Sequence, residues 1–139
     1  MSKEKINRIA WCDRGWFPTY FGFCPSKKAW DREMKRLGIV DCPYPTSDAR
    51  CTSFENATYK DGGKKTLALV TVGEHIDGKN SMGILGILVH ECVHVWQTVR
   101  QDIGEESPSK EFEAYAMQNI VMSIFAAYAE TRGQKTPLK

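Results

Sequence analysis

The sequence feature that most constrains the chain is the pentapeptide HECVH at residues 90–94, which lies inside an apolar run over residues 82–99. Residues four apart on a helix lie one above the other on the same face. The imidazoles of His90 and His94 could therefore bind one metal ion with Glu91 beside them. This HExxH pattern is typical of zinc hydrolases, but it is short enough to arise by chance, so its surroundings decide how it is interpreted.

Length and composition restrict the class of protein. The 139 residues are enough for one domain, residues 1–139, with one core. Hydrophobic residues make up 42% and charged residues 26%, which is ordinary for a soluble globular protein. A net charge of +2 gives no electrostatic case for nucleic acid or a membrane as a partner, and we expect neither.

The N-terminal residues bear on the compartment. Residues 1–14 are charged and lack the apolar segment and cleavage site of a signal peptide. The apolar run contains His90, Glu91 and His94, each of which would be costly at the centre of a bilayer. We therefore expect a soluble, cytoplasmic protein.

Five cysteines form no CxxC pair and leave an odd count, which indicates free thiols in a reducing compartment. A disulfide between Cys42 and Cys51, or a second metal site built from four cysteines, stays open as an alternative. Neither has metal-ligand spacing behind it.

The first forty residues predict one packed loop and one helix. Residues 11–24 hold six aromatic residues among glycine and proline without a helical or strand period, so we expect a loop whose rings fill the open end of the core. A helix is predicted to start at Pro25 or Ser26 and to run to Leu37, with Gly38 ending it.

A β-hairpin follows. Two runs, residues 52–59 and 65–72, flank the turn signal at residues 61–63, and the second run is rich in apolar and β-branched residues.

The HExxH helix is expected over about residues 82–101 with Ser81 as its N-cap. Apolar residues on nearly all sides predict a central position in the fold. Gly83 and Gly86 lower helix propensity by about 1 kcal/mol each, which suggests that another backbone packs closely there. A last helix is predicted over about residues 108–131, so the fold class is α+β.

A catalytic zinc site needs three protein ligands and an open position for water. If the last helix returns antiparallel to the HExxH helix, Glu113 lies about 9 Å from its start and His94 about 10 Å before the end of the first, so the two are level. Glu113 also shares a face with apolar residues, where an unpartnered carboxylate is costly. We predict one zinc ion bound by His90, His94 and Glu113, with Glu111 as the reserve third ligand.

The residues around the HExxH pattern resemble those of known zinc metallopeptidases. An HExxH followed by eighteen residues and a glutamate is similar to the gluzincin branch of zinc metallopeptidases, and EAYA at residues 113–116 resembles a pattern in zinc aminopeptidases. The segments HECVHVWQ, GEESPS and EFEAYAMQNI also resemble small metallopeptidase-like proteins of phage and prophage genomes. The likeness covers mainly residues 81–128.

The resemblance implies a minimal zincin-like domain in which an N-terminal helix and a small antiparallel sheet pack on the HExxH helix and the last helix. It implies a peptide or protein substrate, and the host cytoplasm if the protein is phage-encoded. Glu91 would be the general base that takes a proton from a zinc-activated water and passes it to the leaving amine. An extended substrate would pair with a sheet edge, for which the second hairpin strand is expected, with residues Val70, Thr71 and Val72.

The chain departs from thermolysin-like enzymes at Met117, where they carry an aspartate that orients a ligand histidine. Orienting contacts are then expected from Gln118, Asn119 or a backbone carbonyl. The candidates for stabilising the transition state are His75, after the second hairpin strand, and Tyr20 or Tyr44 from the loops.

Three alternatives remain on sequence grounds. The protein could be a zinc amidase acting on cell-wall peptides, because zinc and a general base do not choose between amide substrates. It could be a catalytically silent, zinc-stabilised phage structural or assembly protein. A helical module without metal is the third. The sequence does not set the oligomeric state.

Overall fold

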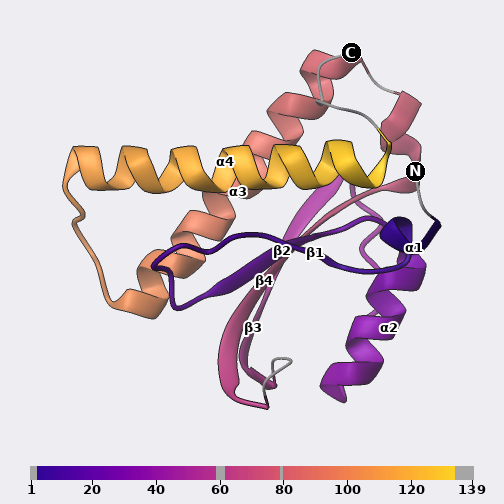
Figure 1. Cartoon of the computed structure of the whole chain (residues 1–139), viewed down its shortest axis with the longest axis horizontal. Helices are drawn as coiled ribbons and strands as arrows, with labels where there is room; N and C mark the ends of the chain where they lie inside the picture. The colour runs from indigo at the N-terminus through magenta and orange to yellow at the C-terminus, as the bar shows by residue number, and fades with distance from the viewer. Residues whose placement is uncertain (1–2, 59–61, 79, 134–139) are drawn as a thin grey trace.

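The computed structural model describes residues 3–58, 62–78 and 80–133. It has an α+β fold in which helices cover both faces of a small sheet (Figure 1). In chain order the elements are α1 (Lys3–Ile6), β1 (Ala10–Trp11), β2 (Tyr20–Cys24), α2 (Lys27–Leu37), β3 (Ala49–Thr58), β4 (Lys64–Val72), the 3-10 helix η1 (Glu74–Gly78), α3 (Ser81–Ile103) and α4 (Lys110–Thr131).

The sheet is mixed, with strand order β1-β2-β4-β3. The predicted hairpin is confirmed, because β3 and β4 pair antiparallel; residues 59–61 at its turn lie outside the described residues. The expectation of an antiparallel sheet is wrong, since β2 pairs parallel to β4.

The loop predicted over residues 11–24 contains strand β2, which lies in the middle of the sheet. Both faces of β2 are covered, so Phe21, Phe23 and Cys24 are all buried and no polar–apolar alternation marks the strand. A Cβ at Gly22 would lie 2.9 Å from the carbonyl oxygen of Ala10, so the close approach of β1 requires a glycine there. The aromatic residues do belong to the core, as expected, but a strand carries them.

β4 is not an edge strand, which corrects the expectation for Val70, Thr71 and Val72. All three are buried, and β4 is hydrogen-bonded to β2 on one side and to β3 on the other. The open edges of the sheet belong to β1 and β3.

Helix α2 confirms the sequence prediction. The Ser26 side chain accepts a hydrogen bond from the amide of Ala29, and Gly38 ends the helix at φ 72°. Its apolar face buries Trp30 and Met34 against Leu69 of the sheet. The predicted packing of α2 on the HExxH helix is wrong, because the sheet lies between them (Figure 1).

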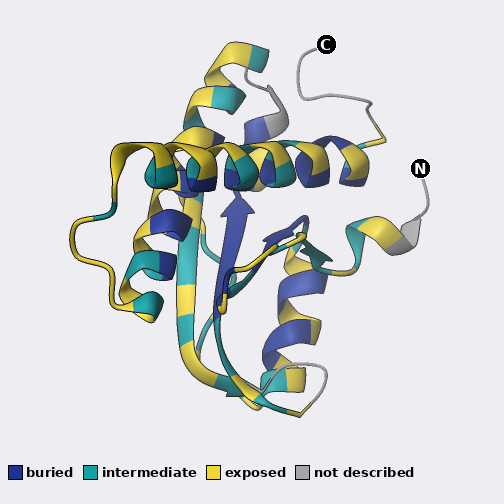
Figure 2. Cartoon of the chain, turned by 60° about the vertical axis from the view of Figure 1, so that its left-hand side comes forward, coloured by how far each residue is buried: buried dark blue, intermediate teal, exposed yellow. Residues whose placement is uncertain are grey.

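Helices α3 and α4 cover the other face of the sheet and turn their buried sides towards it (Figure 2). Asn80, rather than Ser81, caps α3, and Ser109 caps α4. The two helices cross rather than run side by side along their length (Figure 2).

Among the described helices, α3 is the one long and apolar enough to span a membrane by length and composition, a test that the core helix of a soluble protein also passes.

Candidate functional site

A groove of about 490 Å³ runs between α3 and the edge strand β3. One face of α3 lines it with the two histidines and polar residues, and β3 lines it from the other side. A hydrogen bond of 2.9 Å between the hydroxyls of Ser53 and Thr98 ties the strand to the helix beside the groove. The lining residues are Ala49, Arg50, Cys51, Ser53, His90, Glu91, His94, Gln97, Thr98 and Gln101.

The two imidazoles lie side by side on this face, as the HExxH spacing predicts. The ring centroids of His90 and His94 are 5.0 Å apart, and both residues are exposed to the groove. His94 Nδ1 lies 2.8 Å from Gln97 Oε1. A proton on Nδ1 would make this contact a hydrogen bond to the amide oxygen and would leave the Nε2 lone pair available to a metal.

Glu91 is only 6% exposed although it lines the groove. Within the described part of the chain, its carboxylate has neither a hydrogen-bond partner nor an ion-pair partner. The carboxylate oxygens themselves reach the groove, because the buried side-chain oxygen without a partner among the described residues belongs to Thr52. A carboxylate that opens into the groove beside two imidazoles can interact with a cation or a proton donor there.

Two thiols lie near Glu91. Burial, and to a smaller extent the negative charge of Glu91, raises the pKa of Cys51 to about 12. Burial also raises the pKa of Cys92 to about 12, and Cys92 fills the core as the sequence predicts. Both thiols are therefore protonated at neutral pH, and a thiolate ligand is not expected. The structure holds all five cysteines as free thiols.

Gly83 and Gly86 do not mark close backbone packing, contrary to expectation. A Cβ at Gly86 would meet nothing within 4 Å, and one at Gly83 would meet only the Asn80 side chain at 3.4 Å. Both glycines instead line a second cleft of about 430 Å³, which also reaches His90 and Glu91. Their effect is to leave open space beside the histidine pair.

The structure does not bring Glu113 to the histidines. Trp96 Nε1 donates a hydrogen bond of 2.7 Å to Glu113 Oε2. Trp96 lies about 200° around the α3 axis from His94, so this bond ties Glu113 to another side of the helix. The expectation that Glu113 lies level with His94 holds only for antiparallel helices, whereas α3 and α4 cross. Glu111 is exposed in the first turn of α4 and does not line the groove.

No three His, Cys, Asp or Glu side chains form a metal-binding cluster within the residues that the structure describes. The donor set fits a metal ion in part: two imidazoles with the i, i+4 spacing and a buried carboxylate beside them favour zinc, and the third ligand is not in place.

The remaining predicted residues lie in different places. Gln118 and Asn119 are on α4 and do not line the groove. His75, in η1, pairs with Asp48, with Nε2 and Oδ1 2.5 Å apart. Asp48 lines the second cleft together with His90 and Glu91, whereas His75 lines neither this cleft nor the groove.

The open backbone edge beside the histidines belongs to β3. The amide of Gly73 donates a hydrogen bond to the carbonyl of Asp48 at the end of the β3–β4 pairing. In an antiparallel sheet, pairs of opposed residues alternate between those whose backbone groups are hydrogen-bonded to each other and those whose backbone groups are not. By that alternation Ala49, Cys51 and Ser53 direct their backbone N–H and C=O groups away from β4, towards the groove side. The hydrogen bond from Ser47 Oγ to the carbonyl of Ala49 agrees with this assignment.

Sequence reasoning missed Gln97, Asp48 and the edge role of β3. The i, i+3 spacing of Gln97 from His94 was a usable signal. The place of Asp48 in the second cleft and the role of β3 as an edge strand could not be predicted without knowing the strand order.

Comparison of the chain with protein-family models, with curated proteins and with solved structures finds no match.

Proposed function

We propose that the protein is a zinc-dependent hydrolase of peptide bonds that works in the groove between α3 and β3. One observation carries the proposal: the Glu91 side chain, which has no hydrogen-bond or ion-pair partner among the described residues, opens its carboxylate into the groove beside two exposed imidazoles and next to an open strand edge. General-base chemistry needs a carboxylate of this kind at the reacting water, where a metal cation would interact favourably with it.

His90 and His94 supply two metal ligands in this proposal. Glu113 is the third and must leave the indole of Trp96 to reach the metal. A bound zinc ion would supply Lewis-acid chemistry, lowering the pKa of a water molecule and polarising the scissile carbonyl.

The chain's own residues do the rest. Glu91 accepts the proton of the attacking water and returns it to the leaving amine. The outward backbone groups of Ala49, Cys51 and Ser53 pair with an extended peptide, which aligns it along the groove. Asp48 accepts a hydrogen bond from Nε2 of His75 beside the second cleft, so His75 could donate to a substrate oxygen through Nδ1 only as the imidazolium. Free thiols favour a reducing compartment, so we propose that the protein acts in the cytoplasm.

The test combines metal content with cleavage. We expect purified protein to bind about one zinc per chain, to cleave members of a peptide library and to lose that activity in Glu91→Gln while keeping the metal. His90→Ala should lose both. Met122→Ala is the matched surface control, because Met122 is exposed on α4 away from the groove.

Three outcomes would contradict the proposal. Cleavage of murein peptides alone would identify a cell-wall amidase. Zinc binding that stabilises the fold while neither the wild type nor Glu91→Gln cleaves any substrate would identify a structural metal. Absence of zinc binding, with His90→Ala behaving as wild type, would remove the metal altogether.

A further inference from the structure

The edge strand β3 brings a positive charge to the groove. Arg50 is exposed and is the one lysine or arginine among the described residues that line the groove between α3 and β3. Its guanidinium has neither a hydrogen bond nor an ion pair with the part of the chain that the structure describes. The charge of Arg50 is therefore available to a molecule that lies along this edge.

The two faces of β3 separate Arg50 from the histidines. Successive side chains of a strand point to opposite faces of the sheet. Cys51 packs against the core beneath α3, and the Ser53 hydroxyl bonds to α3 itself. Phe54 packs on the other face, in the cluster that α2 buries. Arg50 lies an even number of residues from Phe54, so its side chain belongs to the α2 face, across the strand edge from the histidines.

A peptide strand paired with β3 would meet this charge. Ala49 and Cys51, on either side of Arg50, direct their backbone groups outward, so an added strand places one of its residues directly opposite Arg50. Directly opposite residues share a face of the sheet with Cβ atoms about 4.5–5.5 Å apart, and opposite charges stabilise such a pair. A carboxylate suits this position best, because it can accept two parallel hydrogen bonds from a guanidinium.

We propose that Arg50 selects acidic peptides, with an aspartate or glutamate at the substrate residue opposite it. The inference rests on the proposed function in that an extended peptide occupies the groove, but the charge pair acts on binding whether or not the peptide is cut. Side chains of the adjacent substrate residues point to the α3 face. The acidic preference should therefore fall on one position, or on positions two apart, and be absent at the positions between them.

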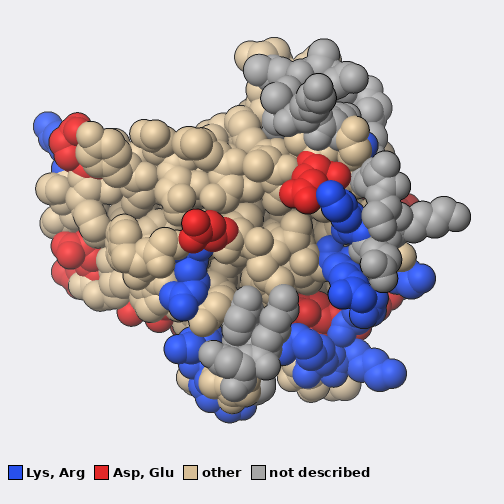
Figure 3. Space-filling model, in the orientation of Figure 1, with Lys and Arg blue, Asp and Glu red and all other residues tan. Residues whose placement is uncertain are grey.

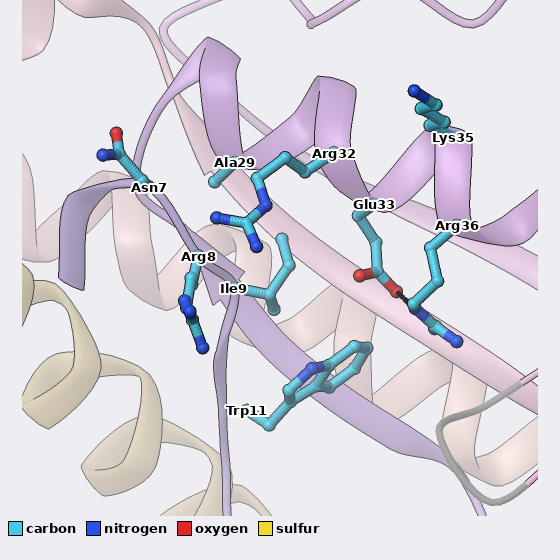
Figure 4. Close-up of a pocket in the computed structure, with 9 residues that line it drawn as sticks. All are labelled: Asn7, Arg8, Ile9, Trp11, Ala29, Arg32, Glu33, Lys35 and Arg36. Carbon is cyan, nitrogen blue, oxygen red and sulfur yellow. Dashed lines mark hydrogen bonds and ion pairs between the residues drawn. The ribbon is translucent and has the colours of Figure 1, made fainter. Parts of the chain in front are cut away.

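A second source of positive charge would produce a general attraction for acidic peptides. Lys and Arg side chains gather around α2 on the face of the molecule shown in Figure 3. Arg32 belongs to α2, is exposed and lines a cleft at the opposite edge of the sheet (Figure 4). Because Arg32 does not line the groove, Arg32→Gln removes the same charge from the general surface and is the matched control for Arg50→Gln.

Cleavage of hexapeptides capped at both ends tests the proposal at low salt. Each peptide carries Glu, Gln or Lys at one position counted from the cleaved bond, and the caps remove the terminal charges. We expect kcat/KM with Glu at the preferred position to exceed that with Gln by about two- to fivefold. Arg50→Gln should remove this preference, and Arg50→Glu should favour Lys at the same position. Arg32→Gln should keep the wild-type preference.

Binding of the same peptides, measured by fluorescence anisotropy with a label on the N-terminal cap, separates this inference from the proposed function. Binding that prefers Glu through Arg50, without cleavage, would support the inference and contradict peptide hydrolysis. Cleavage without a charge preference would overturn the inference alone, as would equal losses in Arg50→Gln and Arg32→Gln or an equal preference at adjacent positions. Neither binding nor cleavage of any peptide would overturn both.

Discussion

The indole of Trp96 donates a hydrogen bond of 2.7 Å to the carboxylate of Glu113. This bond competes with metal binding if Glu113 is the third zinc ligand, because the same carboxylate must leave the indole. We therefore expect Glu113→Gln to weaken zinc binding by about 10-fold or more, and Trp96→Phe, which removes the donor, to strengthen it. Competition with a chromophoric chelator measures both affinities.

The opposite pattern would assign Glu113 a structural role. If Glu113→Gln binds zinc as the wild type does and only lowers the free energy of unfolding, the carboxylate serves Trp96 and the metal has another third ligand. Asp48 is then the next residue to test, since it lines the cleft that reaches His90.

The Glu91 carboxylate should contribute little to the stability of the zinc-free protein. Its side chain is mostly buried and has no partner among the described residues, but its oxygens reach the groove, where water can solvate them. We expect Glu91→Gln to raise the free energy of unfolding of the metal-free protein by no more than about 1 kcal/mol, measured by urea denaturation. A clear loss of stability would show that the carboxylate has a favourable partner in solution.

The sequence predicted those parts of the fold that have a local signal. Ser26 and Gly38 mark the ends of α2, and the fixed i, i+4 spacing places His90 and His94 on one face of α3. Strand β2 has no such signal, because burial on both faces removes the alternation that identifies a strand. Once β2 was missed, β4 was expected at the edge of the sheet rather than in its interior.

The sequence could predict only the part of the site that lies within one helix, because only that part has a local signal. The position of Glu113 depends on how α3 and α4 cross, and the edge role of β3 depends on the parallel pairing of β2 with β4. Both are relationships between distant segments that a single sequence does not encode in any short pattern.

Two glycines should respond in opposite ways to the same substitution. Gly86 lies in α3 with open space around its would-be Cβ, so Gly86→Ala should raise the free energy of unfolding by up to about 1 kcal/mol through helix propensity. Gly22→Ala places a Cβ 2.9 Å from the carbonyl oxygen of Ala10 and should destabilise the protein by about 1–3 kcal/mol. Thermal denaturation of the two variants compares them directly; a shift of the same sign in both would contradict the described packing.

The β3 edge can be tested with proline. Ser53 directs its N–H away from β4, so Ser53→Pro should keep the fold but remove a pairing site for the substrate. Thr52→Pro removes an N–H that bonds to β4 and should lower the free energy of unfolding by about 1–3 kcal/mol. Ser53→Ala is the control for the lost hydrogen bond to Thr98. Peptide cleavage by Ser53→Pro equal to that of Ser53→Ala would show that the substrate does not pair with this edge.

The buried thiols predict a loss of stability at high pH. Burial raises the pKa of Cys12, Cys24, Cys51 and Cys92 from 9.0 to about 12 in the folded chain. Between pH 9 and 12 these thiols ionise in the unfolded chain but keep their protons in the folded one. The folded state then binds more protons, so stability is fully present below pH 9 and falls as the pH rises towards 12.

Each thiol contributes a slope of up to about 1.4 kcal/mol per pH unit in this window. Urea denaturation at a series of pH values measures the total, and Cys24→Ala should reduce the slope by roughly one thiol's share while lowering stability at all pH values through the cavity that it leaves. An unchanged slope in Cys24→Ala would mean that Cys24 ionises as readily in the folded chain as in the unfolded one, and that water reaches it beside Ser26.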